Sequence, residues 1–129
     1  METLHSAKTY FAVQCRNDES PDELAKLILQ TAKASGLRFT GLEYMGRDFF
    51  GNAEYYRFRT DLGDISTILD RLQTAGRGVV SSKPGGFVLK MPGGRHGLVS
   101  SSRMYALPRQ GRLYRGTAMK LWEEQFAPN

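Results

Sequence analysis

Acidic side chains are missing from a long part of this sequence: between Arg71 and Trp122 there is no aspartate or glutamate. That stretch carries ten basic residues, whereas the first 70 residues hold eleven acids against eight bases, a net charge of −3. Since the whole chain has a formal net charge of +5, its positive charge belongs to the second half. A charge asymmetry of this kind favours a polyanion or an acidic protein surface as partner.

Other features are scarce as well, and each scarcity excludes a class of protein. The single cysteine, Cys15, cannot form an intramolecular disulfide, which suits a reducing compartment, and it is predicted to be a buried structural thiol. No run approaches the roughly 20 apolar residues that span a bilayer, and the N-terminus lacks a signal-peptide pattern. We therefore expect a cytoplasmic protein with no membrane partner. His5 and His96, the two histidines, have no cysteine or acid at ligand spacing, so no metal or other cofactor is expected.

The first part of the chain predicts a strand followed by a helix. Residues 8–16 (KTYFAVQCR) are rich in aromatic and β-branched side chains that alternate between apolar and polar, which is typical of a half-buried strand. A capping box then marks a helix start: Ser20 caps, Pro21 takes the first helical position, and Glu23 completes the box. An apolar stripe follows at helical spacing, and Gly36 ends the helix.

The same alternation of elements continues to residue 82. The expected elements are strands at 37–45 and 54–60, joined by a loop at 46–52, a helix capped by Asp61 that ends at Gly76, and a short strand at 78–82. The resulting β-α-β-β-α-β order predicts an α+β fold, a ferredoxin-like sandwich that occupies residues 1–82.

One face of the predicted sheet is expected to pack on the helices and the other to face solvent. Alternation along 54–60 places Tyr55 and Arg57 on the open face, to which Tyr44 is also assigned. Aromatic rings and guanidinium groups stack on nucleic-acid bases, so these three residues are candidates for a stacking face. The alternatives are that they only pack and stay solvated, or that this face forms a homodimer.

Residues 83–129 predict a Gly- and Arg-rich extension. Two Pro-Gly-Gly turns bracket residues 87–91, which are expected to add an edge strand as part of a hairpin. Residues 95–116 show little periodicity, so we expect an irregular basic arm that lies across the domain or becomes ordered on a partner. Residues 117–126 predict a short amphipathic helix, which docks back on the domain or inserts into a groove of another protein.

Arginine outnumbers lysine in the predicted arm, and guanidinium groups pair bidentately with phosphate or carboxylate. The candidate contacts to phosphate or to an acidic partner are the basic residues of the extension: Lys83, Lys90, Arg95, Arg103, Arg109, Arg112 and Arg115.

Three functions remain open at this point. The pattern favours a non-catalytic nucleic-acid-binding protein, for RNA or single-stranded DNA, that uses its basic half for phosphate contacts. The alternative is a small inhibitor or adaptor that binds an acidic or nucleic-acid-binding groove of a larger protein complex, as a phage-type inhibitor of a host nucleic-acid enzyme would. The third is a small basic ribonuclease with His96 as general acid or base. An enzyme is the least favoured of the three.

Overall fold

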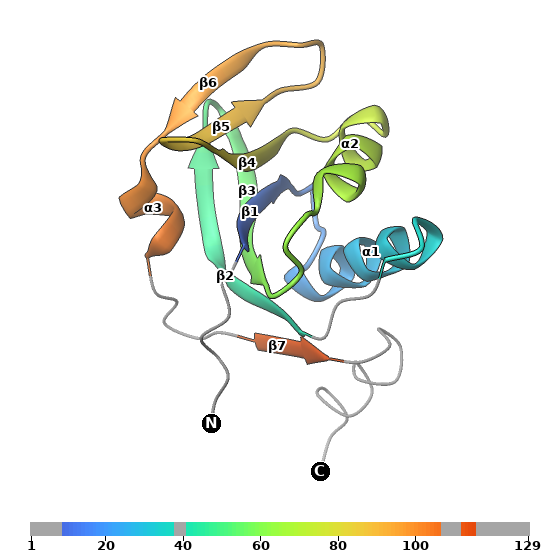
Figure 1. The fold of residues 1–129 in the computed structure, drawn as a ribbon. Helices are drawn as coiled ribbons and strands as arrows, with labels where there is room; N and C mark the ends of the chain where they lie inside the picture. Colours follow the sequence, from blue (N-terminus) through green and yellow to red (C-terminus); the bar gives the residue numbers. More distant parts are fainter. Residues whose placement is uncertain (1–8, 38–40, 107–111, 116–129) are drawn as a thin grey trace.

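The structure, a computed structural model, describes residues 9–37, 41–106 and 112–115, which form an α+β fold with an open antiparallel sheet (Figure 1). The elements are β1 (Thr9–Gln14), α1 (Pro21–Ala34), β2 (Gly41–Phe50), β3 (Ala53–Thr60), α2 (Ser66–Thr74), β4 (Val79–Lys83), β5 (Gly86–Lys90), β6 (His96–Val99), α3 (Ser101–Tyr105) and β7 (Arg112–Arg115). None of the helices in this part of the chain has the length and apolar character of a membrane span.

All the described strands belong to one sheet. Their order is β6-β5-β4-β1-β3-β2-β7, and each neighbouring pair is antiparallel. The predicted succession of strand, helix, strand, strand, helix and strand is confirmed by the elements from β1 to β4. β5 and β6 continue the sheet beyond β4, whereas β7 pairs with β2 at the other side (Figure 1). Within the described chain, β6 and β7 are thus the two outer strands, six strand spacings or about 29 Å apart.

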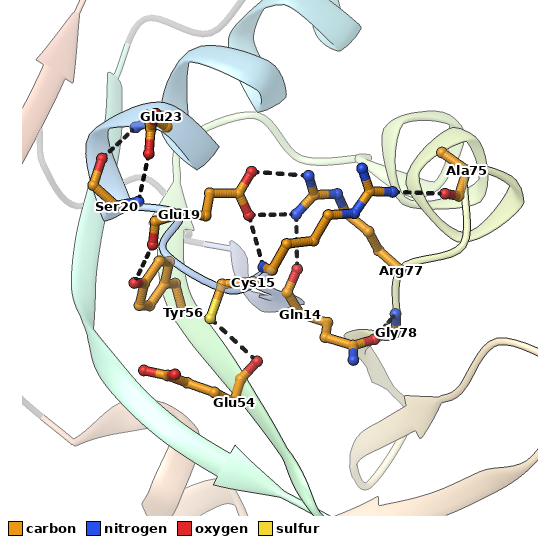
Figure 2. Close-up of polar contacts among 11 residues, drawn as sticks. Gln14, Cys15, Glu19, Ser20, Glu23, Glu54, Tyr56, Ala75, Arg77 and Gly78 are labelled. Atoms are coloured by element: carbon orange, nitrogen blue, oxygen red, sulfur yellow. Dashed lines mark hydrogen bonds and ion pairs between the residues drawn. The ribbon is translucent and has the colours of Figure 1, made fainter.

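The first helix begins where the sequence predicts. The hydroxyl of Ser20 accepts a hydrogen bond from the Glu23 backbone N–H at 3.1 Å, and the Glu23 carboxylate accepts one from the Ser20 N–H at 2.8 Å (Figure 2). Pro21 is the first helical residue, so the missing N–H costs no hydrogen bond there. Gly36 follows the helix with a φ of 74°, a left-handed conformation that glycine adopts without strain.

Apolar side chains form two clusters, one on each face of the sheet. Helices α1 and α2 cover one face and α3 lies on the other (Figure 1). The cluster under α1 and α2 is centred on Phe11, Val13, Leu24, Ile28, Phe58 and Ile68. The cluster on the α3 side contains Ala12, Phe50, Tyr55, Val80, Phe87, Leu89, Val99 and Met104. Both faces of the central strands are therefore buried.

The second helix begins later than predicted. The sequence assigns its cap to Asp61, but α2 starts at Ser66. The Asp61 carboxylate instead accepts a hydrogen bond from the Gly41 N–H at 3.3 Å, next to the start of β2. Asp64 accepts from the Ser66 N–H at 3.0 Å and thus satisfies one of the free donors at the true helix start. The capping assignment to Asp61 is wrong because this carboxylate contacts a neighbouring strand.

Strand β2 is shifted relative to its prediction over 37–45. It begins at Gly41 and continues to Phe50, so most of the loop predicted over 46–52 is strand. A bulge between Tyr44 and Gly46 lets the pairing with β3 continue.

The extension is more ordered than predicted. The strand expected at 87–91 is confirmed as β5, but it is not an edge strand, because β6 pairs with its outer side. The expectation of an irregular arm over 95–116 is wrong for the described part, because β6 and β7 pair with the sheet and α3 packs on it. Val99 and Met104 stabilise this part, since both side chains are buried in the α3-side cluster. The helix predicted over 117–126 lies outside the described residues.

Candidate binding surface

The predicted stacking face is not open to solvent. Tyr55 is only 1% exposed and Arg57 only 7% exposed, because the α3-side cluster packs on this face of the sheet. The Tyr55 ring packs edge-on against Phe50, and burial raises the pKa of its hydroxyl to about 12. The assignment of Tyr55 and Arg57 to base stacking is therefore corrected: the rings and guanidinium groups of this face belong to a second core. The α3-side cluster also covers the sheet face that was considered as a homodimer surface.

Arg57 binds the end of α3 rather than an external anion. Its Nη1 donates hydrogen bonds to the carbonyl oxygens of Arg103 at 2.8 Å and Ala106 at 2.9 Å, and its Nη2 donates to the Met45 carbonyl. The carbonyls of Arg103 and Ala106 lie at the end of α3, and carbonyl groups at the end of a helix attract a cation. Burial lowers the pKa of Arg57, and its Nε has no hydrogen-bond partner in the described chain. Arg57 is a structural side chain that ties α3 to the sheet.

Tyr44 lies on the opposite face from the one predicted. It pairs directly with Phe58 across β2 and β3, and directly opposed residues point to the same face. Its ring contacts Tyr56 edge-on at 5.5 Å and Phe58 at 5.8 Å between centroids. Tyr44 therefore packs beside the α1–α2 cluster, and it is not a neighbour of Tyr55 on a common surface.

Arg103, one of the predicted phosphate contacts, is bound to an acid of the first half. Its Nε and Nη2 donate to the Asp48 carboxylate at 3.1 and 2.9 Å, and Nη2 also donates to the Phe49 carbonyl. The guanidinium lies 4.5 Å from the centre of the Phe50 ring. Burial alone would raise the pKa of Asp48, but the hydrogen bonds from Arg103 and from the Phe49 N–H lower it. The Arg103 guanidinium thus has a carboxylate partner inside the molecule.

Arg77 also binds an acid of the first half of the chain, at a more buried site (Figure 2). It is 4% exposed, and its two Nη atoms donate to the two carboxylate oxygens of Glu19 at 2.6 and 2.9 Å. A third bond joins its Nη1 to the Gln14 carbonyl at 3.0 Å. Burial by itself would raise the pKa of Glu19, but Arg77 and the Arg16 N–H lower it. The backbone carbonyl of Glu19 also accepts from the Tyr56 hydroxyl at 2.6 Å, so this pair joins three parts of the fold.

Four further bases of the extension lie in or next to β4, β5 and β6. Lys83 ends β4, Lys90 ends β5, Arg95 precedes β6 and His96 begins it; we call these four residues the basic flank. Lys83, Arg95 and His96 are exposed, and Lys90 is half-buried. No carboxylate of the described chain forms an ion pair with any of the four.

The basic flank has two ends. Lys90 pairs directly with His96 beside Arg95, whereas Lys83 lies about 13 Å along β4 from the residue that pairs with Lys90. Lys90 also lines a hollow of about 220 Å³ that includes Asp64 and Asp70, which reduces the positive field around it. Arg95 and Lys83 therefore offer the most available positive charge.

The other predicted contacts are far from the flank or outside the described residues. Arg112 and Arg115 are in β7, at the opposite edge of the sheet from β6. Arg109 lies outside the described residues. The single continuous cationic surface expected from the sequence is thus divided: the bases are distributed between two sheet edges, and two of them pair with internal acids.

Groups that could carry chemistry are dispersed. His96 is exposed at the start of β6, and His5 lies outside the described residues. In the described ranges there is no group of three His, Cys, Asp or Glu side chains that could hold a metal ion. Cys15 is buried, and its thiol donates to the Glu54 carbonyl at 3.4 Å (Figure 2). Burial, followed by the charge of Glu54, raises the pKa of this thiol, which makes it a poor nucleophile.

Comparison with protein-family models, with curated proteins and with solved structures finds no match to this chain.

Sequence reasoning missed Leu98, the most exposed large apolar side chain of the described surface at 79%. It lies in β6, within the part of the chain that was predicted to be irregular. The sequence did contain a signal for this strand, namely the second Pro-Gly-Gly turn. The residues that follow this turn pair with β5 and form the second strand of a tight hairpin. Four residues are too few to show an alternating pattern, so the strand was overlooked.

Proposed function

We propose that this chain is a non-catalytic binding protein of the adaptor or inhibitor type, which holds an acidic segment of a protein partner at the basic flank. One observation carries the proposal: internal acids neutralise Arg77 and Arg103, whereas no described carboxylate pairs with Lys83 or Arg95. Exposed cations without an internal partner attract anions over several ångströms and accelerate association.

The surroundings of the basic flank fit a protein partner better than a nucleic acid, although the sequence favoured nucleic-acid binding. Binding of single strands commonly uses aromatic rings as stacking platforms; of the two predicted rings, Tyr55 is buried and Tyr44 packs, half-buried, against Tyr56 and Phe58. The basic flank lies instead beside Leu98, an exposed aliphatic side chain. An acidic protein segment with an apolar residue matches both the charge and the leucine, whereas a phosphate backbone matches only the charge.

Binding by this surface involves no bond making or breaking. Arg95 and Lys83 would orient the acidic segment, and burial of Leu98 would slow its release, since charged pairs mainly affect association and apolar contacts dissociation. If the segment belongs to the acidic groove of a larger enzyme, occupation of that groove by this protein would inhibit the enzyme.

Two finer points belong to the same proposal. We infer that β1 to β4 with α1 and α2 form a ferredoxin-like sandwich, because the order β4-β1-β3-β2 with both helices on one face agrees with split β-α-β units. We also infer a cytoplasmic location, which a single buried free cysteine supports.

The test compares two labelled probes at about physiological salt: an acidic peptide with interspersed leucines, and a single-stranded RNA of equal charge. Fluorescence anisotropy with the purified chain is expected to show saturable binding of the peptide and weaker binding of the RNA. Tighter binding of the RNA that falls steeply with salt would return the nucleic-acid function to first place. Binding of neither probe would contradict an anionic partner altogether.

A further inference from the structure

Strand β6 presents an edge of the sheet that no described strand covers. It is the outermost strand beyond β5 in the described chain (Figure 1). The Met91 N–H donates to the Arg95 carbonyl at 2.7 Å, which makes that pair hydrogen-bonded. Hydrogen-bonded and non-hydrogen-bonded pairs alternate along an antiparallel ladder, so Gly97 and Val99 bond to β5. The N–H and C=O groups of His96 and Leu98 therefore point away from the sheet.

The side chains of these two residues are also open. His96 and Leu98 lie on the same face of β6, because they are two residues apart. Both are exposed, and Leu98 pairs with the half-buried Val88 of β5, so a small apolar patch lies beside the basic end of the strand. An edge strand with free backbone groups and an exposed leucine is a template for another strand.

We propose that the partner binds by strand addition: an extended acidic segment pairs with the outer edge of β6, with an apolar residue beside Leu98 and an acid beside His96 and Arg95. This inference rests on the proposed function and adds how the segment is held. Main-chain hydrogen bonds supply affinity in this mode, and the side chains on alternate positions supply specificity. Since β6 has four residues, it is about 13 Å long and accommodates a segment of similar length.

Charge argues for an acidic partner over a second copy of this chain. In a two-fold antiparallel pair of β6 edges centred on Gly97, His96 of each copy would lie opposite Leu98 of the other. Arg95 of each copy would meet no acid on the facing edge, because the sequence has none from Arg71 to Trp122. An acidic segment supplies the carboxylates that this edge lacks and neutralises Arg95.

The experiment uses the unaltered protein and a labelled peptide, Thr-Leu-Thr-Glu-Thr-Glu-Thr, in three forms. One form is unmodified, the second is N-methylated on leucine and glutamate, and the third is N-methylated on the internal threonines. N-methylation removes a hydrogen-bond donor without changing side chains or charge. Only one of the two alternating sets of N–H groups faces β6 in a paired strand. We therefore expect one methylated form to bind at least about 10-fold more weakly, and the other to bind like the unmodified peptide.

The outcomes separate this inference from the proposed function. If both methylated peptides bind as tightly as the unmodified one, or lose affinity equally, strand addition is refuted while the acidic partner stands. If the unmodified peptide does not bind, both proposals fail. Leu98→Ala adds a side-chain readout: it keeps the edge N–H, and we expect a weaker affinity, by about 10-fold, with an unchanged preference between the methylated forms. An unchanged affinity would refute the contact with Leu98.

Discussion

Two groups of basic residues in the second half of this chain differ in what surrounds them. Arg77 is buried and bound by both carboxylate oxygens of Glu19, and Arg103 is bound by Asp48. Lys83 and Arg95 are exposed, and no described carboxylate pairs with them. The amino-acid sequence does not distinguish the two groups, because both consist of basic residues in the acid-free stretch. Only the fold shows that internal acids bind the first group, whereas the second is exposed without a described carboxylate partner.

An acid-free stretch of sequence is not by itself a binding surface. The acids that neutralise Arg77 and Arg103 lie 58 and 55 positions away in the chain. A net charge therefore overestimates the free charge of a segment whenever the fold brings in acids from elsewhere. Substitutions that disturb the first group should therefore destabilise the protein, whereas substitutions in the second should not.

The largest effect is expected for Glu19→Gln. It leaves the Arg77 guanidinium buried without its anion, and removal of one partner of a buried pair costs about 3 kcal/mol of unfolding free energy. Urea unfolding measures this change. The matched control is Glu54→Gln, which breaks the exposed pair with Arg47 and should leave the unfolding free energy nearly unchanged. Equal effects of the two substitutions would mean that burial of Arg77 does not matter.

Glu19 also predicts a pH dependence. Because the folded state lowers its pKa below the ordinary value of 4.5, its contribution to stability is present above that pH and is lost as the pH falls through the lowered pKa. The unfolding free energy of the unaltered protein should therefore fall in acid, and Glu19→Gln should reduce this slope. The same slope in both proteins would contradict the role given to the pair.

An intermediate effect is expected for Gly78→Ala, next to Arg77. A Cβ at this position would lie 2.0 Å from the Tyr55 hydroxyl oxygen, so a buried ring must move, at a cost of about 2 kcal/mol. Tyr55→Phe removes that oxygen and should recover part of the loss in the double variant. Thermal unfolding of both single variants and the double variant checks the coupling. Additive losses would show that the two sites do not touch.

A smaller effect is expected for Asp48→Asn, which releases Arg103. Both partners are partly exposed, so solvent screens their attraction and the loss should be about 0.5 kcal/mol. Hydrogen exchange of the α3 amides should accelerate more than that of α1, because Arg103 holds α3 to β2. Uniform exchange across both helices would show that the pair does not secure α3.

The elements that sequence reasoning predicted well are those with local signals. The start of α1 is encoded within four residues, since Ser20 and Glu23 bond to each other. The β5 strand lies between two Pro-Gly-Gly turns, so its ends are marked by the residues next to it. Such short-range rules predicted the succession of elements up to β4 and the existence of β5, but not its place inside the sheet.

The failures involve contacts between distant segments. Asp61 looked like a helix cap because the sequence does not show that its carboxylate meets Gly41. Tyr55 and Arg57 looked open because the α3-side cluster, which covers them, includes residues more than 40 positions later in the chain. Of the candidate site, Lys83, Lys90 and Arg95 were predicted as contacts. Leu98 and the outer edge of β6 depend on a strand pair that four residues could not indicate.

The most direct test of the difference between the two groups is a charge reversal at Lys83 and Arg95, made as the double variant Lys83→Glu/Arg95→Glu. Its unfolding free energy and its affinity for the acidic peptide are measured side by side, with Lys33→Glu/Arg71→Glu on α1 and α2 as a control of equal charge change. We expect an unchanged unfolding free energy and a loss of peptide binding in the first variant, with binding retained in the control. Equal binding by the two variants, or unfolding of the first, would contradict it.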